Sequence, residues 1–509
     1  MLTSIDYVVI VVYLAGVAAF GIMAGGRQKN TTDYFLGSRD LPWWAVSFSV
    51  VATETSTLTV IGIPAVAYGG SLTFLQLTFG YLLGRVIVAG LFLPQYFRGQ
   101  LSTAYAFLGN RYGDTMRGTA SVTFLITRLL ADGVRLFATA IPLKVITDSA
   151  GLELSYFTII AVIAIATIIY TMIGGIKAVI WMDVVQMAVY VGGAIGAVYV
   201  LLGRVPADWF AQAAAAGKTQ VVNFAFDESL SSWITDPYTF VTAVVGGAIF
   251  SMASHGTDQL IVQRLLTCRN EVDSKKALIA SGVVVMFQFA LFLLVGLLLW
   301  SHYEGQSVEQ LGLTRSDEIF PMFIIAGLPP GISGILLAGI VAAAMSTLSS
   351  SLNSLASSSV LDLVERVRGR PIREERALFV SRVLTMLWGI VFIFFATLFE
   401  DESNPVVELG LAIASFTYGG LLGVFLLGLL NKATDQVDAV VSFLFTIGFM
   451  TWVIFSVWHH PTQGWTVILM PSDEVIAEQG LRSIGWPWYT VIGAAVHLIL
   501  GSLLALRHR

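Results

Sequence analysis

Charged residues are scarce in this chain of 509 residues: only 12% are Asp, Glu, Lys or Arg, while 56% are hydrophobic. A soluble protein of this length needs more polar surface than such a composition supplies, so a soluble globular fold is excluded. The formal net charge of −5 gives no indication of a nucleic-acid partner, and we expect none.

Cysteine and histidine are sparse as well. Cys268 is the single cysteine, which excludes an internal disulfide framework. The six histidines show no metal-binding spacing such as HExxH. An intramembrane enzyme would need a nucleophile with its base or paired carboxylates, and neither arrangement is visible around Glu54, Asp132 or Asp183. We therefore expect neither an enzyme nor an organic cofactor.

Long apolar runs are what the sequence has in abundance. We count about thirteen runs of roughly 20 residues or more, each long enough to cross a lipid bilayer as a helix. The first run, near 5–25, lacks a small-residue cleavage site and is followed by further spans, so we interpret it as a span. Most of the 28 basic residues fall in alternate loops, which predicts an outside N-terminus and a cytoplasmic C-terminus. We predict an all-α multi-pass protein of the plasma (inner) membrane.

One apolar stretch contains a cluster of polar residues. The sequence AAAMSTLSSSLNS holds six hydroxyls and an amide. In a helix, Ser346, Ser349 and Ser350 share one stripe, and the carbonyl of Ala343 lies beside the hydroxyls of Ser346 and Thr347. Such oxygens suit a small alkali cation. The alternative is that small residues only allow close helix packing, with the hydroxyls bonded to the backbone one turn earlier.

A second polar stretch, ATETSTLTV, begins at Ala52. Its hydroxyls and the following Gly-Ile-Pro disfavour a regular helix, and non-helical backbone inside a bilayer must line a protein cavity. A buried ionised Glu54 would cost about 2.5 kcal/mol or more, so it is expected to be paired or functional. Two irregular polar segments far apart in sequence are typical of a transporter site at the membrane midplane.

Seven short motifs occur in an order that a known family also shows. They are DYFLGSRDLPWWAV (33–46), ATETS (52–56), STAYAFLGNRYG (102–113), GGIKAVIWMDVVQM (174–187), DQLIVQRLL (258–266), AAAMSTLSSSLNS (342–354) and SFTYGGLLGVFLLGLL (415–430). With these motifs the chain resembles the solute:sodium symporters, the group that contains sodium/glucose, sodium/proline and sodium/sialic acid transporters.

The resemblance implies a fold of the leucine-transporter type, with inverted five-helix repeats and discontinuous helices. The expected segments are an extra N-terminal helix and loop (1–42), the first repeat (43–203), an extracellular loop (204–237), the second repeat (238–430) and two extra C-terminal helices (431–509). The oligomeric state is not fixed by the sequence, and a monomer is compatible with it.

The resemblance also implies where sodium binds. The first site is expected to use the carbonyls of Ala52, Thr55 and Ala343 and the hydroxyls of Ser346 and Thr347. Thr347 replaces the more common Ser but keeps its hydroxyl. Neutral oxygens bind the ion weakly, as release requires.

Some members of the family hold a second sodium ion on the same serine stripe, completed by an aspartate. Here that site would comprise Asp183, Ser346, Ser349 and Ser350. No cationic partner of Asp183 is apparent in the sequence, which favours a bound cation. The alternative is that Asp183 is a hydrated residue at a helix start and that the two later serines only pack.

The substrate site is less sharply indicated. By family position, Ser56 and Thr59 on the unwound helix and Phe74 on the next span are implied to contact the substrate. Glu54 stands where many members have a neutral or shorter polar side chain, and we include it among the candidates.

Three charged residues, Arg128, Asp132 and Arg135, share one face of the span near 118–147. One interpretation is that Arg135 or Arg128 binds a substrate carboxylate, because a sialic acid transporter of the family uses an arginine on this span. The other is a structural network in which Asp132, and Glu54 with it, neutralises both arginines.

We conclude from the sequence that the chain couples sodium influx to the uptake of a small polar solute by alternating access. An anionic or zwitterionic solute is expected, such as a sialic acid, an amino acid or a monocarboxylate; a sugar or polyol is the alternative. A channel or a sensor that does not transport is less compatible with these motifs. Gln263 and Arg264 match a family motif, and either close the inner side or only pack.

Overall fold

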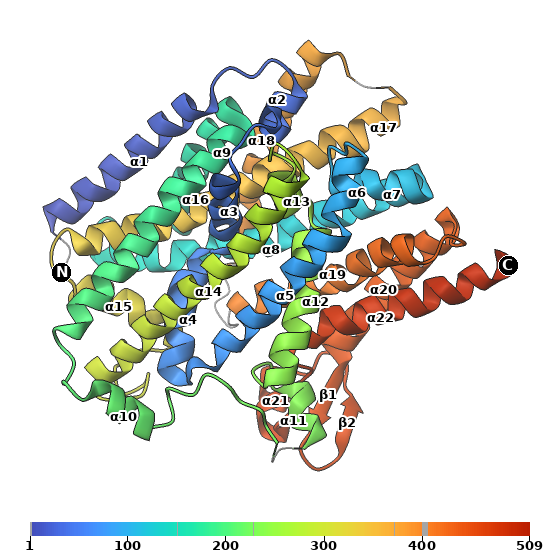
Figure 1. Ribbon diagram of the computed structural model, residues 1–509. Helices are drawn as coiled ribbons and strands as arrows, with labels where there is room; N and C mark the ends of the chain where they lie inside the picture. The colour runs from blue at the N-terminus through green and yellow to red at the C-terminus, as the bar shows by residue number, and fades with distance from the viewer. Residues whose placement is uncertain (1–2, 150, 227–228, 371, 400–405, 509) are drawn as a thin grey trace. The chain divides into compact units, whose positions relative to one another are not determined.

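The computed structural model describes residues 3–149, 151–226, 229–370, 372–399 and 406–508 (Figure 1). The part of the predicted second repeat at 400–405 lies outside these residues. The chain forms two compact units. The first consists of Met1–Leu75, Arg128–Val221 and Gln263–Gly410, and the second of Gln76–Thr127, Val222–Val262 and Leu411–Arg509. Every residue that the sequence predicts for ion or substrate binding belongs to the first unit.

The first unit is helical. Its elements are α1 (Ser4–Gly25), α2 (Thr31–Leu36), η1 (Gly37–Arg39), α3 (Trp43–Glu54), α4 (Thr57–Gly69), η2 (Leu72–Phe74), α9 (Tyr156–Leu202), α10 (Trp209–Ala215), α14 (Glu271–His302), η4 (Ser316–Glu318), α15 (Ile319–Ala326), α16 (Ile332–Ser358), η5 (Ser359–Val364), α17 (Glu365–Arg368), α18 (Glu374–Ala396) and η6 (Thr397–Phe399). It also includes the part of α8 (Asp114–Ser149) from Arg128 onward and the end of α13 (Gln259–Leu265).

The second unit contains helices and a small sheet. Its elements are α5 (Leu75–Leu91), α6 (Leu93–Arg98), α7 (Ala104–Tyr112), α11 (Leu230–Thr235), η3 (Thr242–Gly246), α12 (Gly247–Gly256), α19 (Val406–Leu430), α20 (Gln436–Ser456), β1 (Val457–His460), β2 (Gly464–Val467), α21 (Asp473–Gln479), β3 (Arg482–Ser483), α22 (Trp486–Ala505) and η7 (Leu506–His508). The antiparallel sheet has the order β2-β1-β3, with Trp458 opposite Thr466 and Ser483. The all-α prediction therefore needs a correction, because this connection pairs as short strands.

Eight helices of the described residues are long and apolar enough to cross a membrane, or nine if the bent pair α3 and α4 is one span. The chain is thus a multi-pass membrane protein that is mostly helical. The figure of thirteen spans stays a prediction. Part of the difference lies in α9, whose 47 residues are long enough for two crossings of a bilayer.

The predicted break in the second span is confirmed. α3 ends at Glu54, Thr55 and Ser56 are extended (φ/ψ −82°/95° and −90°/172°), and α4 begins at Thr57 after a bend of 67°. The Thr55 hydroxyl donates to the carbonyl oxygen of Val51 at 2.8 Å. A side chain that bonds to its own backbone in this way competes with regular helix, which explains why the threonine cluster interrupts the span.

A second interruption divides α9 at Gly175. This glycine has a φ of +58°, which residues with a Cβ rarely adopt. A Cβ there would lie 2.7 Å from the carbonyl oxygen of Tyr34. Gln28 donates to the carbonyl oxygen of the preceding Gly174 at 3.0 Å. The Gly-Gly pair therefore lets the chain turn close against α2.

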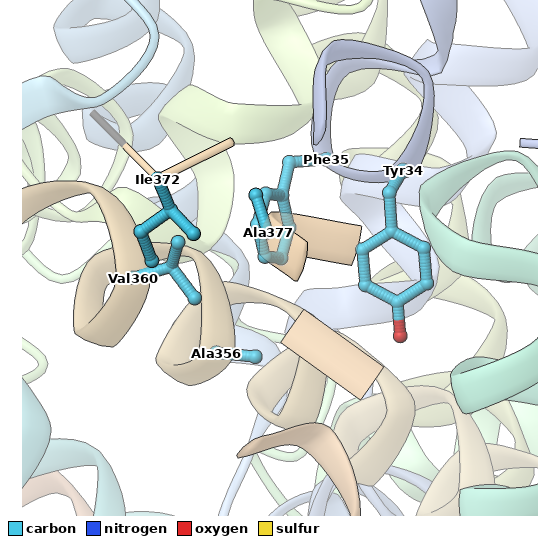
Figure 2. Packing of buried hydrophobic residues seen from close by; sticks show 6 residues of the cluster. All are labelled: Tyr34, Phe35, Ala356, Val360, Ile372 and Ala377. Atoms are coloured by element: carbon cyan, nitrogen blue, oxygen red, sulfur yellow. The ribbon is translucent and has the colours of Figure 1, made fainter. Parts of the chain in front are cut away.

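Helix α16 lies at the centre of the first unit, where it packs most extensively on α9, while α3 and α4 pack on α14 (Figure 1). A hydrophobic cluster attaches α2 to the end of α16. Its buried members are Tyr34, Phe35, Ala356, Val360, Ile372 and Ala377 (Figure 2). The Tyr34 hydroxyl also lies 3.1 Å from the hydroxyl of Thr385 in α18. The short helix α2 is therefore fixed on two long helices.

Candidate functional site

The break between α3 and α4 lies against the middle of α16. Before the break, the hydroxyl of Thr53 lies 3.2 Å from that of Ser350. After it, the Thr57 hydroxyl donates to the carbonyl oxygen of Ile340 at 3.2 Å. These two contacts on α16 are ten residues apart, which corresponds to roughly 15 Å of helix. The extended segment therefore faces the polar stretch of α16.

The residues predicted for the first sodium site are buried on both sides of this contact. The Thr347 hydroxyl donates to the carbonyl oxygen of Ala343 at 3.2 Å, as the spacing predicted. Ala52 belongs to the last turn of α3, whose carbonyls lose their intrahelical partners. The Thr55 hydroxyl accepts a hydrogen bond from Gln288 of α14 at 2.6 Å, a partner that the sequence did not indicate.

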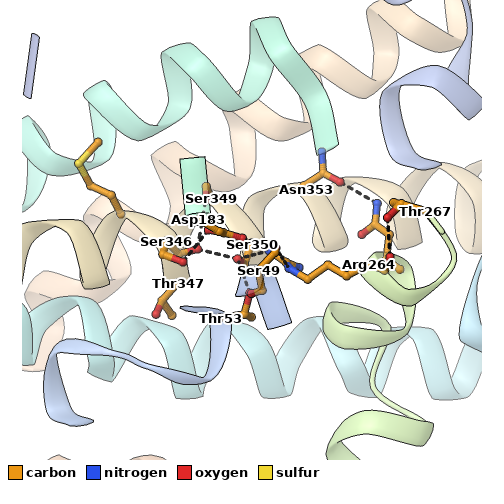
Figure 3. A network of polar contacts seen from close by, with 12 residues as sticks. Ser49, Thr53, Asp183, Arg264, Thr267, Ser346, Thr347, Ser349, Ser350 and Asn353 are labelled. Carbon is orange, nitrogen blue, oxygen red and sulfur yellow. Dashed lines mark hydrogen bonds and ion pairs between the residues drawn. The ribbon is translucent and has the colours of Figure 1, made fainter. Parts of the chain in front are cut away.

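Asp183 of α9 is the centre of a buried polar cluster (Figure 3). The Ser346 hydroxyl donates to its Oδ1 at 2.6 Å, and the Ser49 hydroxyl donates to its Oδ2 at 2.5 Å. A guanidinium nitrogen of Arg264 lies 3.4 Å from the same Oδ2. The sequence-based view that Asp183 has no cationic partner is therefore wrong, because α13 supplies one that is 81 residues away in the chain.

Arg264 makes two further contacts in this cluster. Its Nε donates to the Ser49 hydroxyl at 3.0 Å, and a terminal nitrogen donates to the Ser350 hydroxyl. Ser349 and Ser350 in turn donate to the carbonyl oxygen of Ser346 at 3.0 and 2.6 Å. The guanidinium thus shares its oxygen partners with the stripe predicted for a second sodium ion.

The three charged residues of α8 contact one another, an arrangement that both interpretations of the sequence allow. The Asp132 Oδ1 lies 3.2 Å from a guanidinium nitrogen of Arg135 and 3.6 Å from one of Arg128. Its Oδ2 accepts a hydrogen bond from Ser351 of α16. The Asp132 side chain is only 1% exposed, whereas that of Arg135 is 19% exposed. Asp132 therefore connects α8 to the polar helix, and Arg135 extends from this network.

A small cavity of about 10 Å³ lies between α8, the break and α16, with room for about one water molecule. It is lined by Ser56, Asp132, Arg135, Leu136, Thr139, Ala344, Thr347 and Leu348. The structure thus brings together Ser56 and Arg135 from the predicted substrate residues and Thr347 from the first sodium site. A solute of several heavy atoms is larger than this space.

The other substrate candidates do not line this cavity. Glu54 and Thr59 are partly exposed on either side of the break, and the Phe74 ring packs edge-on against that of Phe289 at 5.4 Å. Thr139 was missed by the sequence analysis, although its hydroxyl lines the cavity and bonds to Thr57 at 2.9 Å. The sequence could have indicated Thr139, because this residue follows Arg135 by four positions and therefore lies one helical turn beyond the charged face of α8.

A bent helix pair beside a buried polar helix, with an arginine in the lining of the cavity between them, is typical of an ion-coupled secondary transporter. Residues 34–445 match the Sodium:solute symporter family, and the chain belongs to this family. The resemblance drawn from the motifs is therefore confirmed. The protein is a sodium-coupled secondary transporter that works by alternating access, and it is not an enzyme.

Individual relatives agree with this assignment. The sodium/sialic acid symporter NanT of Aliivibrio fischeri is 29% identical, with 88% of each chain covered. The sodium-coupled monocarboxylate transporter 1 of Mus musculus is 28% identical over 88% of this chain and 72% of its own. The solved substrate-bound, outward-open structure of a Na⁺-coupled sialic acid symporter superposes with a TM-score of 0.83 at 26% identity, covering 100% of this chain and 98% of its own.

Proposed function

We propose that the transporter takes up a small organic anion with sodium and binds the carboxylate of that anion through Arg135. The observation that carries this proposal is the position of the Arg135 side chain, which lines the same cavity as Ser56 and Thr347. A guanidinium has five N–H donors in a fork that matches a carboxylate, and the ion pair with Asp132 uses one nitrogen.

The guanidinium at the cavity supports an anion. Arg135 lines the cavity, and Arg128 and Arg135 both lie within ion-pair distance of Asp132. A carboxylate would form charge-assisted hydrogen bonds with Arg135, which are roughly twice as strong as the bonds that a neutral sugar or polyol would form. The named solutes of the two relatives, sialic acid and monocarboxylates, carry a carboxylate. An amino acid remains the second candidate, because Asp132 also lines the cavity and accepts hydrogen bonds.

For the first sodium ion we propose the carbonyls of Ala52, Thr55 and Ala343 with the hydroxyls of Ser346 and Thr347. The freed backbone at the break and the contact between Ala343 and Thr347 support this set. Thr347 also lines the cavity, so an ion at this site would lie next to the solute. Such adjacency gives a direct reason for coupled binding.

For a second sodium ion we propose Asp183 with Ser346, Ser349 and Ser350. The support is that the cluster already stabilises a monovalent cation, the guanidinium of Arg264, on Asp183. With this second site occupied, two sodium ions would be transported with each solute.

For the topology we propose what the sequence predicts: thirteen spans, an outside N-terminus and a plasma (inner) membrane location. The repeats are proposed at 43–203 and 238–430, flanked by 1–42, 204–237 and 431–509. The distribution of basic residues among the loops supports this orientation.

The test is uptake by purified protein in proteoliposomes with an inward sodium gradient. We expect a radiolabelled sialic acid or short monocarboxylate to accumulate in the presence of a sodium gradient. Replacing sodium by choline should abolish this accumulation. Candidates can first be ranked by sodium-dependent thermal stabilisation of the protein. Sodium-driven uptake of a sugar or polyol, without uptake of any carboxylate, would contradict the anion assignment but not the transport class.

A further inference from the structure

Arg264 binds to the oxygens that the second sodium ion would need. We propose that Arg264 is an internal exchange cation: its guanidinium neutralises Asp183 at one stage of the cycle and is displaced by a sodium ion at another. This inference rests on the proposed second sodium site and assigns that site a competitor that the chain itself supplies.

The first argument is the overlap of ligands (Figure 3). The guanidinium contacts Asp183 at 3.4 Å and donates to the hydroxyl of Ser350, and both residues belong to the proposed ion site. Its Nε uses the hydroxyl of Ser49, which itself donates to Asp183. A sodium ion would need the same lone pairs, so the two cations cannot both be bound in these positions.

The second argument is the balance of charge. The side chains of Asp183 and Arg264 are both 0% exposed. One carboxylate with one monovalent cation is neutral, whereas two cations leave one positive charge and no cation leaves one negative charge. Uncompensated charge is strongly unfavourable in a buried site. Exchange of one cation for the other therefore costs less than addition of sodium or loss of the arginine.

The third argument is that the backbone around Arg264 is held independently of its guanidinium. The neighbouring Gln263 donates to the carbonyl oxygen of Phe35 at 2.8 Å and to Asn353 at 2.7 Å. The Thr267 hydroxyl donates to the carbonyl oxygen of Arg264 at 2.6 Å. The long side chain can thus rotate away from Asp183 while the end of α13 stays in place.

An exchange cation would make it easier for sodium to leave the buried site. A buried carboxylate with several hydroxyls retains sodium more strongly than a site of neutral oxygens, whereas transport requires the ion to leave again. Return of the guanidinium replaces the ion on Asp183, so the carboxylate never stands alone when sodium leaves for the cytoplasm.

The experiment compares radioactive sodium binding to the purified full-length wild type, Arg264→Gln and Arg264→Lys. We expect Arg264→Gln to bind the second ion at least tenfold more tightly, because its competitor is gone, and to release it more slowly. Arg264→Lys retains the positive charge and should stay closer to the wild type. Adding Asp183→Asn to Arg264→Gln should abolish the gain, which assigns it to this cluster.

Unchanged or weaker sodium binding by folded Arg264→Gln would overturn the proposal. If this variant does not fold, the wild type gives the answer by side-chain hydrogen exchange: the guanidinium protons of Arg264, followed by NMR, should exchange faster in saturating sodium than in potassium, and equal rates would overturn the proposal. Sodium-driven uptake by the wild type is measured alongside. Uptake with one sodium per solute, together with unchanged binding in Arg264→Gln, removes the exchange cation and leaves the transport function intact.

Discussion

Replacing Arg135 by glutamine separates substrate binding from structural support. If Arg135 binds the carboxylate, Arg135→Gln removes a hydrogen bond to a charged group, worth about 1.5–3 kcal/mol. That loss corresponds to an increase of roughly 10- to 150-fold in the substrate Kd. The measurement is binding of the radiolabelled anion to purified protein at saturating sodium, with KM for uptake in proteoliposomes as the second readout.

Folding should survive this change, for a reason visible in the network. Asp132 keeps two partners, Arg128 at 3.6 Å and the hydroxyl of Ser351, so its buried carboxylate is not left alone. The side chain that is removed is already 19% exposed. The free energy of unfolding should therefore fall by no more than about 1 kcal/mol, the scale of a partly exposed ion pair.

The matched control is Arg315→Gln. Arg315 pairs with Asp317 at 3.3 Å, nearly the distance of the Arg135 pair, and it does not line the cavity. It should change substrate affinity less than twofold. Wild-type affinity in folded Arg135→Gln would refute the carboxylate role. Misfolding of Arg135→Gln that is rescued by adding Asp132→Asn would instead identify a structural network.

Three further outcomes follow from other parts of the first unit. Replacing Ser346 and Thr347 together by alanine should raise the sodium concentration for half-maximal uptake about tenfold or more, about 1.4 kcal/mol; unchanged sodium dependence would remove both from the ion site. Gly175→Ala should lower stability by about 1–3 kcal/mol in thermal unfolding because of its left-handed φ of +58°, whereas Gly448→Ala, with open space around it, should not. Ser351→Ala should reduce the factor by which sodium tightens substrate binding. A factor equal to that of the wild type would show that the hydrogen bond between Ser351 and Asp132 of α8 does not contribute to the coupling.

Much of the fold could be predicted, because the relevant signals are local. The break after Glu54 follows from a run of hydroxyl residues, and the turn in α9 coincides with a Gly-Gly pair. The pairing of Asp132 with both arginines follows from spacings of three and four residues on one helix. Each of these depends on neighbours in the sequence, which helix geometry relates directly.

Only part of the candidate site could be predicted, because several of its contacts join residues that are far apart in the sequence. The contact between Asp183 and Arg264 joins residues 81 positions apart, and no periodicity relates them. Ser49 reads as one more residue of an apolar span, yet its hydroxyl bonds to both members of this pair. The strands near Trp458 were missed because four-residue strands leave too short a pattern of alternation to recognise.

Helix α16 places the proposed ion and solute contacts on adjacent stripes. Ser346 and Ser350 are four residues apart and contact the Asp183 cluster, while Thr347 lines the cavity and Ser351, four residues later, bonds to Asp132. A shift of α16 therefore changes both environments at once, without any intervening loop. Coupling between two ligands is reciprocal, so the factor by which sodium tightens solute binding must equal the factor by which solute tightens sodium binding. If α16 carries that coupling, a change at Ser351 must weaken this shared factor, and an unchanged factor would locate the coupling in another part of the protein.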